Sequence, residues 1–208
     1  AEKIRKIGGH GFKNLRAEEG RVRLTDDVFQ DPKYERHDIL GWNYRMSEII
    51  AAVALAQIEQ VEKCVELRRY AAEQLINAIG DSKLLVPQKV ANNSQCDYFS
   101  LACVYNEEYS KGLSWQQFRA KFKEATGMGI YGAWQLQYKE PTVYNGTFKY
   151  RNKELYDNLD YSKCNCKNAE HVQSRIMQFK TNIRSKSLAR KIGSKLSKLI
   201  EDSSLWIL

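Results

Sequence analysis

A single long amphipathic segment constrains the fold of this chain more than any other feature of its sequence. From Ser47 to Gly80, apolar residues recur at steps of three, four or seven, which predicts one continuous helix of about nine turns. Ser47 can cap its first turn, and Gly80 can take the left-handed conformation that ends a helix. At about 1.5 Å per residue the helix is about 50 Å long. Because that length exceeds the interior of a small domain, we expect the helix to bridge two domains or to line a dimer interface.

The segment before this helix predicts a functional loop. Residues 2–7 have the spacing of a helix end, and the glycines of Gly8–Gly11 stop it. The stretch from Phe12 to Leu40 is rich in charge and has no hydrophobic period, which is typical of functional or disordered loops. Because the chain begins without Met and inside a predicted helix, we expect it to be a piece of a longer polypeptide.

After Gly80 the pattern becomes α/β. Runs of aromatic and branched residues predict strands, and Ser114–Gln117 form a capping box that opens a helix ending near Gly127. In chain order we expect strands over 84–86 and 96–105, a helix over 115–127, a strand or an extended active-site segment over 129–138, an irregular region over 142–163, and helices over 169–179 and 187–200.

The composition is that of an ordinary globular protein. Of the 208 residues, 43% are apolar and 28% are charged, which excludes collagen-like and disordered classes. No apolar run approaches the length of a membrane span, and the first residues lack the apolar stretch of a signal peptide, so no membrane partner is expected. The five cysteines are an odd, dispersed set, which favours a cytoplasmic location.

The net charge of +8 is concentrated near the C-terminus. Between His171 and Ile200 there is no Asp or Glu, and the cations are Arg175, Lys180, Arg184, Lys186, Arg190, Lys191, Lys195 and Lys198. Such a set either binds a polyanion or forms a solvated face. Because the cations are spread around the predicted helices, we favour a solvated face or a surface that faces an acidic part of the same protein. Nucleic acid is therefore not the expected partner.

The clearest candidate site joins the polar loop to the long helix. His37, Asn43 and Arg45 bring an imidazole, an amide and a guanidinium to one helix N-terminus. Unpaired N–H groups and the positive dipole end suit a phosphate or another anion there. The alternative is that Asn43 and Arg45 only fix the loop and brace the helix start.

Other candidate chemistry is sparse. Tyr131 and Trp134, near Tyr138, either bind a sugar or a base or form the outer strand of the small domain. Cys164 and Cys166 are too close in sequence for a zinc knuckle, so no metal is expected. Neither of the common glycine-rich phosphate loops occurs.

The segment that begins Gly41-Trp-Asn-Tyr-Arg-Met-Ser-Glu and continues to Arg69 closely resembles the DegT/DnrJ/StrS family of nucleotide-sugar aminotransferases. His37 before this motif, and Asn168-Ala-Glu170 before the final helices, agree with the family pattern. The family's usual Pro before that Ala-Glu pair is Asn168 here. The resemblance is strong over residues 1–80 and weaker after them.

The resemblance implies an α/β fold, the C-terminal portion of a fold-type I pyridoxal-phosphate (PLP) transferase. Residues 1–46 would be the end of the large domain and the active-site loop, 47–80 the long interdomain or dimer helix, and 81–208 the small α/β domain. Such enzymes are homodimers that move an amino group from glutamate to a keto nucleotide sugar, which serves cell-surface polysaccharide or glycan synthesis.

The resemblance also implies site residues. Asn43 occupies the position whose side chain reaches across the dimer to the PLP phosphate, and Arg45 is assigned to the cofactor with it. His37, Tyr131 and Trp134 are assigned to the substrate.

The lysine that binds PLP in this family lies before the region that matches Ala1, so these 208 residues are not expected to catalyse alone. Two alternatives follow. A sugar dehydratase of the same family replaces that lysine, and a non-catalytic dimeric module would use the basic C-terminal helices to hold an anionic partner.

Overall fold

Two compact units make up the computed structural model, Ala1–Gln60 (unit 1) and Val61–Leu208 (unit 2). The structure describes residues 2–13, 32–144, 157 and 160–204. Most of the charged loop predicted after Phe12, and most of the irregular region 142–163, lie outside the described residues. The three-part division at residues 46 and 80 stays a prediction.

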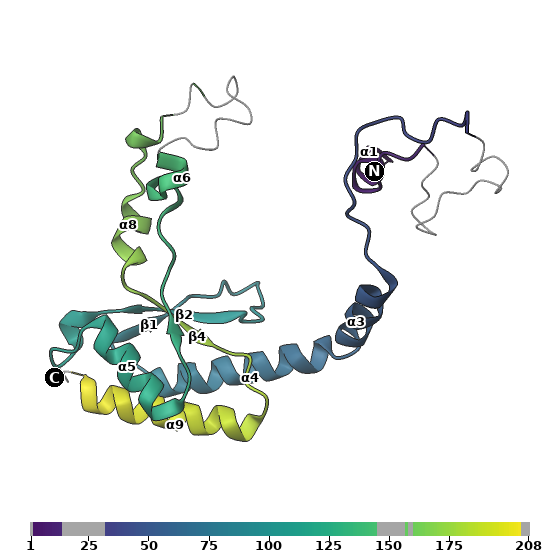
Figure 1. Ribbon diagram of the computed structural model, residues 1–208. Coiled ribbons are helices and arrows are strands. Elements are labelled where there is room, and N and C mark those ends of the chain that lie inside the picture. The colour runs from purple at the N-terminus through teal and green to yellow at the C-terminus, as the bar shows by residue number, and fades with distance from the viewer. Residues whose placement is uncertain (1, 14–31, 145–156, 158–159, 205–208) are drawn as a thin grey trace. The chain divides into compact units, whose positions relative to one another are not determined.

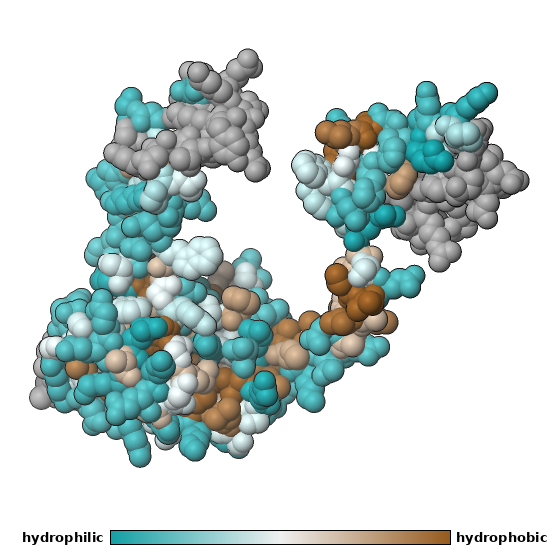
Figure 2. Space-filling view, viewed as in Figure 1, coloured by the Kyte–Doolittle hydropathy of each residue, from teal (hydrophilic) through white to brown (hydrophobic). Residues whose placement is uncertain are grey.

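Unit 1 contains α1 (Glu2–Gly8) and α3 (Glu48–Ile58). All residues of α3 except Glu48 and Gln57 are apolar, and none of its residues is buried. Figure 2 shows these apolar atoms at the surface where Figure 1 labels α3. In the described part of unit 1, the only buried residues are Gly9 and Gly11, so its described residues form no hydrophobic core.

The single helix predicted from Ser47 to Gly80 is wrong, because α3 ends at Ile58 and α4 (Val61–Ile79) begins anew. The Gln60 amide donates to the Gln57 carbonyl at 3.2 Å, a three-residue spacing that interrupts the helical ladder. Residues 55–64 are all exposed, so no packing against other described residues holds the segment straight. The predicted Ser47 cap is confirmed, since its hydroxyl accepts from the Ile50 amide.

Unit 2 is a sheet covered on one side by helices. Its described elements are α4 (Val61–Ile79), β1 (Leu85–Pro87), β2 (Ser100–Tyr105), η1 (Glu107–Tyr109), α5 (Trp115–Thr126), β3 (Ile130–Tyr131), η2 (Gln137–Lys139), α6 (Pro141–Tyr144), η4 (Tyr161–Lys163), α8 (Lys167–Gln173), β4 (Ile176–Lys180) and α9 (Lys186–Ser203).

The four strands form an antiparallel sheet in the order β1-β2-β4-β3. Strand β4 is central, with Ser100 opposite Lys180 on one side and Tyr131 opposite Gln178 on the other. The helix predicted over 169–179 is therefore wrong in its second half. The Arg175 amide donates to the Val172 carbonyl at the end of α8, and the chain then extends because both neighbours of β4 supply ladder hydrogen bonds.

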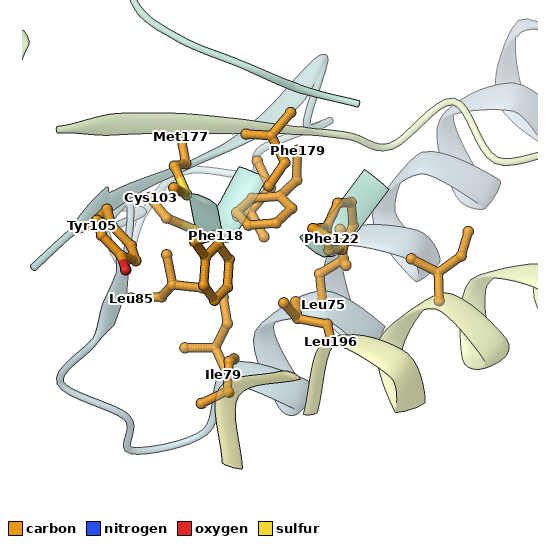
Figure 3. Packing of buried hydrophobic residues seen from close by; sticks show 14 of the residues in the cluster. Leu75, Ile79, Leu85, Cys103, Tyr105, Phe118, Phe122, Met177, Phe179 and Leu196 are labelled. Atoms are coloured by element: carbon orange, nitrogen blue, oxygen red, sulfur yellow. The ribbon is translucent and has the colours of Figure 1, made fainter. Parts of the chain in front are cut away.

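The core fills the space between this sheet and α4, α5 and α9, which lie together on one side of it (Figure 1). Strand alternation sends Leu101, Cys103 and Tyr105 of β2 inward. Figure 3 shows how the core side chains meet. Burial also raises the pKa of the Cys103 thiol to about 12, so it stays a thiol inside the core.

Local chemistry sets the ends of the covering helices, and for α5 both ends are as predicted. Ser114 and Gln117 form the capping box of α5, and Gly127 ends the helix at a φ of 75°. Helix α9 begins at a Ser185 cap, and a Cβ at Gly193 would lie 2.9 Å from the Gln74 carbonyl oxygen. Glycine therefore lets α9 approach the α4 backbone closely.

Replacing Phe118 tests whether this core supplies the stability of unit 2. Phe118 is fully buried, whereas Phe99 is 88% exposed and serves as a matched control. We expect Phe118→Ala to lower the free energy of unfolding by about 3–5 kcal/mol through the cavity it leaves. Phe99→Ala should cost about 1 kcal/mol or less. Urea unfolding followed by circular dichroism measures both, and equal losses would contradict the assignment.

Candidate functional site

The loop that carries Asn43 is fixed by backbone pairing to the end of α1. Gly9 forms an antiparallel bridge with Asn43, and Phe12 forms another with His37. Between the bridges, the His10 amide donates to the Trp42 carbonyl at 2.9 Å. The two short segments thus form a ribbon, and the Asn43 backbone is held at its end next to α3.

Two glycines let these segments touch. A Cβ at Gly41 would lie 2.2 Å from the Gly11 nitrogen, and a Cβ at Gly11 would lie 1.8 Å from the Ile39 carbonyl oxygen. Gly11 also has a φ of 75°, which side chains rarely adopt. Any side chain at either position would therefore push the segments apart.

His37 serves the ribbon directly. Its Nδ1–H donates to the His10 carbonyl oxygen at 2.7 Å, and its ring stacks on Phe12 with centroids 4.7 Å apart. A carbonyl only accepts, so the neutral ring carries its proton on Nδ1 and keeps Nε2 as an acceptor. His37, which the sequence assigned to the substrate, thus holds the loop together through Nδ1 and its ring, and Nε2 remains as an acceptor.

Asn43 and Arg45 lie together at the start of α3. With Met46 and Ser47 they line an open concavity of about 450 Å³. The Asn43 and Arg45 side chains are exposed there. Ser47 satisfies one amide of the first turn, and the remaining N–H groups of that turn have no partner within the helix. An amide donor, a guanidinium and a helix N-terminus form a donor set that suits an anion.

Tyr131 and Trp134 lie in unit 2, so the structure groups the predicted site residues into two sets. Tyr131 ends β3 and is 57% exposed, with the Lys180 ammonium 4.9 Å from its ring centroid. Trp134 is 89% exposed, and its carbonyl accepts from the Gln173 side chain at 3.1 Å.

The family model for the DegT/DnrJ/EryC1/StrS aminotransferase family matches residues 1–182. The chain belongs to this family. It is 29% identical over 88 residues to the GDP-perosamine synthase of Vibrio cholerae, a match that covers 42% of this chain and 24% of that protein.

Two solved structures share the fold. Helicobacter pylori PseC, an aminotransferase involved in the biosynthesis of pseudoaminic acid, is 15% identical with a TM-score of 0.63. A GDP-4-keto-6-deoxymannose-3-dehydratase, solved with a trapped PLP-glutamate geminal diamine, is 18% identical with a TM-score of 0.58. These matches cover 96% and 91% of this chain but 46% of each neighbour, so the chain spans less than half of them. The predicted family and α/β fold are confirmed.

The lysines next to the ribbon do not resemble an amine that binds PLP. Such an amine must lose its proton to act as a nucleophile. Hydrogen bonding to Glu35 at 2.8 Å raises the pKa of Lys13, and hydrogen bonding to Asp38 raises that of Lys6. Both ammonium groups are therefore held in the charged form.

Sequence reasoning missed two arrangements in unit 2. The Tyr138 hydroxyl donates to Glu170 at 2.5 Å, which raises the pKa of Tyr138 to about 12 and lowers that of Glu170. Lys180 lies beside Tyr131 because β4 is a strand. The sequence does carry a signal for this strand, because apolar Met177 and Phe179 alternate with polar Gln178 and Lys180. That alternation could have predicted Lys180 on the polar face of the strand.

The basic residues of α9 are partly used inside unit 2. Lys186 pairs with Glu66 at 2.6 Å, Arg190 donates to the Tyr70 hydroxyl at 3.0 Å, and Lys195 donates to the Ala125 carbonyl. These contacts agree with a surface that faces its own protein. Within the described ranges, no group of three or more His, Cys, Asp or Glu residues is placed to hold a metal. Among the helices that the structure describes, none is long and apolar enough to cross a membrane.

Gly41→Ala tests whether the ribbon depends on the glycine contact. The clash with the Gly11 backbone introduces strain of about 1–3 kcal/mol, so the His10 and Trp42 amides should exchange with solvent about tenfold faster or more. Gly129→Ala is the matched control, because a Cβ there meets nothing within 4 Å. Hydrogen exchange followed by NMR measures both variants, and unchanged rates in Gly41→Ala would refute the dependence.

Proposed function

We propose that this chain is part of a PLP-dependent aminotransferase that moves an amino group from glutamate to a keto nucleotide sugar. Membership of the family supports the reaction class. The observation that carries the proposal is the concavity at α3, where the ribbon holds Asn43 and Arg45 beside a helix N-terminus. We place the enzyme in the cytoplasm, in the synthesis of cell-surface polysaccharide or glycan precursors.

The residues at α3 fit the phosphate of PLP. A phosphate monoester carries close to two negative charges and accepts several hydrogen bonds. The Asn43 amide can donate to it, the Arg45 guanidinium adds charge, and the first turn of α3 supplies N–H groups. When bound, PLP supplies the electron sink for amino-group exchange. The lysine, ring-stacking aromatic and aspartate that the family uses around the ring lie before the region matching Ala1.

Three further residues are assigned to the substrate. His37 keeps Nε2 as an acceptor for a substrate hydroxyl, because Nδ1 is committed to His10. Tyr131 and Trp134 contact the nucleotide sugar through their exposed rings. In the reaction, glutamate becomes 2-oxoglutarate and the keto carbon of the sugar gains the amine.

A homodimer is part of the proposal. Helix α3 exposes Ile49, Ile50, Val53, Leu55 and Ile58 at 58–79% of their surface. A helix with apolar residues on every side is stable in water only when another surface buries those residues. A second copy that covers α3 would bring Asn43 to the cofactor of its partner, which is the role that the family resemblance implies for this position.

The reaction can be tested with the complete gene product, PLP and ¹⁵N-labelled glutamate. GDP- and UDP-linked keto sugars are the candidate acceptors, and mass spectrometry follows the products. We expect ¹⁵N in the sugar and an equal amount of 2-oxoglutarate. A sugar that has lost water without gaining ¹⁵N would establish the dehydratase instead, and no reaction with any acceptor would favour the binding module.

Asn43→Ala tests the phosphate contact in the same protein. A hydrogen bond to a charged group contributes about 1.5–3 kcal/mol, so PLP should dissociate about tenfold more readily or more. Asn77→Ala on the exposed side of α4 is the control and should retain PLP. Equilibrium dialysis with cofactor absorbance measures retention. Equal retention by the two variants would remove Asn43 from the cofactor site.

A further inference from the structure

The sheet of unit 2 has one face that α4, α5 and α9, the helices that pack on its core side, do not cover. Because Leu101 and Phe179 point into the core, strand alternation turns Ser100, Gln178 and Lys180 to the opposite side. Tyr131, opposite Gln178 in the register, lies on that side as well. We call the surface formed by Ser100, Tyr131, Gln178 and Lys180 the Tyr131 face.

Hydrogen bonds hold the polar part of the Tyr131 face in place. The Ser100 hydroxyl donates to Gln178 Oε1 at 3.3 Å, and Gln178 Nε2 donates to the Gly132 carbonyl at 3.0 Å. The backbone register fixes Ser100 opposite Lys180. These side chains therefore stand on a rigid platform, which reduces the ordering cost of binding a ligand.

One cation stands beside an exposed aromatic ring on this face. The Lys180 ammonium is 4.9 Å from the Tyr131 ring centroid. Among the described residues, no carboxylate forms an ion pair with Lys180. The Arg68 guanidinium, 5.6 Å from the Phe99 ring centroid, belongs to α4 on the helix-covered side and does not lie on this face.

We propose that the Tyr131 face binds the nucleoside diphosphate end of the sugar nucleotide. A base stacks on the exposed Tyr131 ring, and the diphosphate lies against the Lys180 ammonium. This assignment rests on the proposed function, because it takes the nucleotide sugar as the substrate class. It goes beyond that proposal by naming which end of the substrate binds here and by adding Lys180.

The chemistry of the face favours this ligand over simpler ones. A neutral sugar gains nothing from a cation that lacks a carboxylate partner. Inorganic phosphate or pyrophosphate uses the cation but leaves the Tyr131 ring without a partner. A nucleoside uses the ring alone. Only a group that is flat at one end and anionic at the other uses both.

The test is an NMR titration of the ¹⁵N-labelled 208-residue chain with GDP, UDP, guanosine and inorganic pyrophosphate. We expect at least one nucleoside diphosphate to shift the amides of Tyr131, Gln178 and Lys180, and to bind more tightly than guanosine or pyrophosphate. Lys180→Ala should weaken that binding about tenfold or more, since bonds to charged groups are strong. Tyr131→Ala should weaken it about as much, whereas Tyr131→Phe keeps the stacking ring and should bind as the native chain does.

Lys191→Ala is the matched control, because Lys191 is exposed on α9 and does not lie on the Tyr131 face. Four results would overturn the proposal: no shifts at this face with either nucleotide, pyrophosphate binding as tightly as the nucleotides, binding unchanged in Lys180→Ala, or an equal loss in Lys191→Ala. The ¹⁵N-transfer assay is independent of this titration. Transfer without binding at the Tyr131 face would refute this inference alone, and binding without transfer would refute the aminotransferase.

Discussion

The contact between the backbones at Gly11 and Gly41 is the constraint on which the candidate cofactor site depends. Hydrogen bonds between two short segments form only when their backbones come within about 3 Å. At Gly11 and Gly41 the neighbouring backbone lies so close that only the hydrogen of glycine fits. The resulting ribbon connects the end of α1 to the start of α3, and so it decides where Asn43 and Arg45 stand. The described part of unit 1 thus positions these residues through backbone contacts, since its described residues form no hydrophobic core.

Unit 2 is organised in the opposite way, by side chains packed between a sheet and three helices. Phe118, Phe122 and Phe179 fill the middle of that core, and Gly193 lets α9 close it against α4. The residues that stabilise this unit and those of the proposed Tyr131 face therefore lie on opposite sides of the sheet. One side carries the apolar residues of the core, and the other carries polar and aromatic groups.

Features that depend on neighbouring residues were predictable from the sequence. The Ser114 capping box, the Gly127 terminus and the Ser47 cap involve atoms within four positions of each other, and each is present as expected. Strand β4 was not predicted, because its conformation depends on hydrogen bonds to strands dozens of residues away. The break after Ile58 was missed because apolar spacing carries no information on whether packing supports a helix along its whole length.

The candidate site shows the same division between local and distant information. The motif around Asn43 predicted an anion site at the start of α3, but the pairing of this segment with Gly9 could be known only from the structure. Tyr131 and Trp134 were assigned to the substrate because the family resemblance implies that role for them. Lys180 was overlooked because residues 176–179 were expected to be helical.

The exposed apolar surface of α3 has a consequence for how the two units respond to dilution. Unit 2 buries its own apolar side chains, so its folding equilibrium is an intramolecular property. Under the proposed dimer, the burial that stabilises α3 occurs only on association, so the order of unit 1 follows mass action and rises with protein concentration. At low protein concentration, as at the start of synthesis in a cell, α3 is an exposed apolar surface, and it is covered only after two chains have met. Cofactor binding and assembly are then linked equilibria, each strengthening the other.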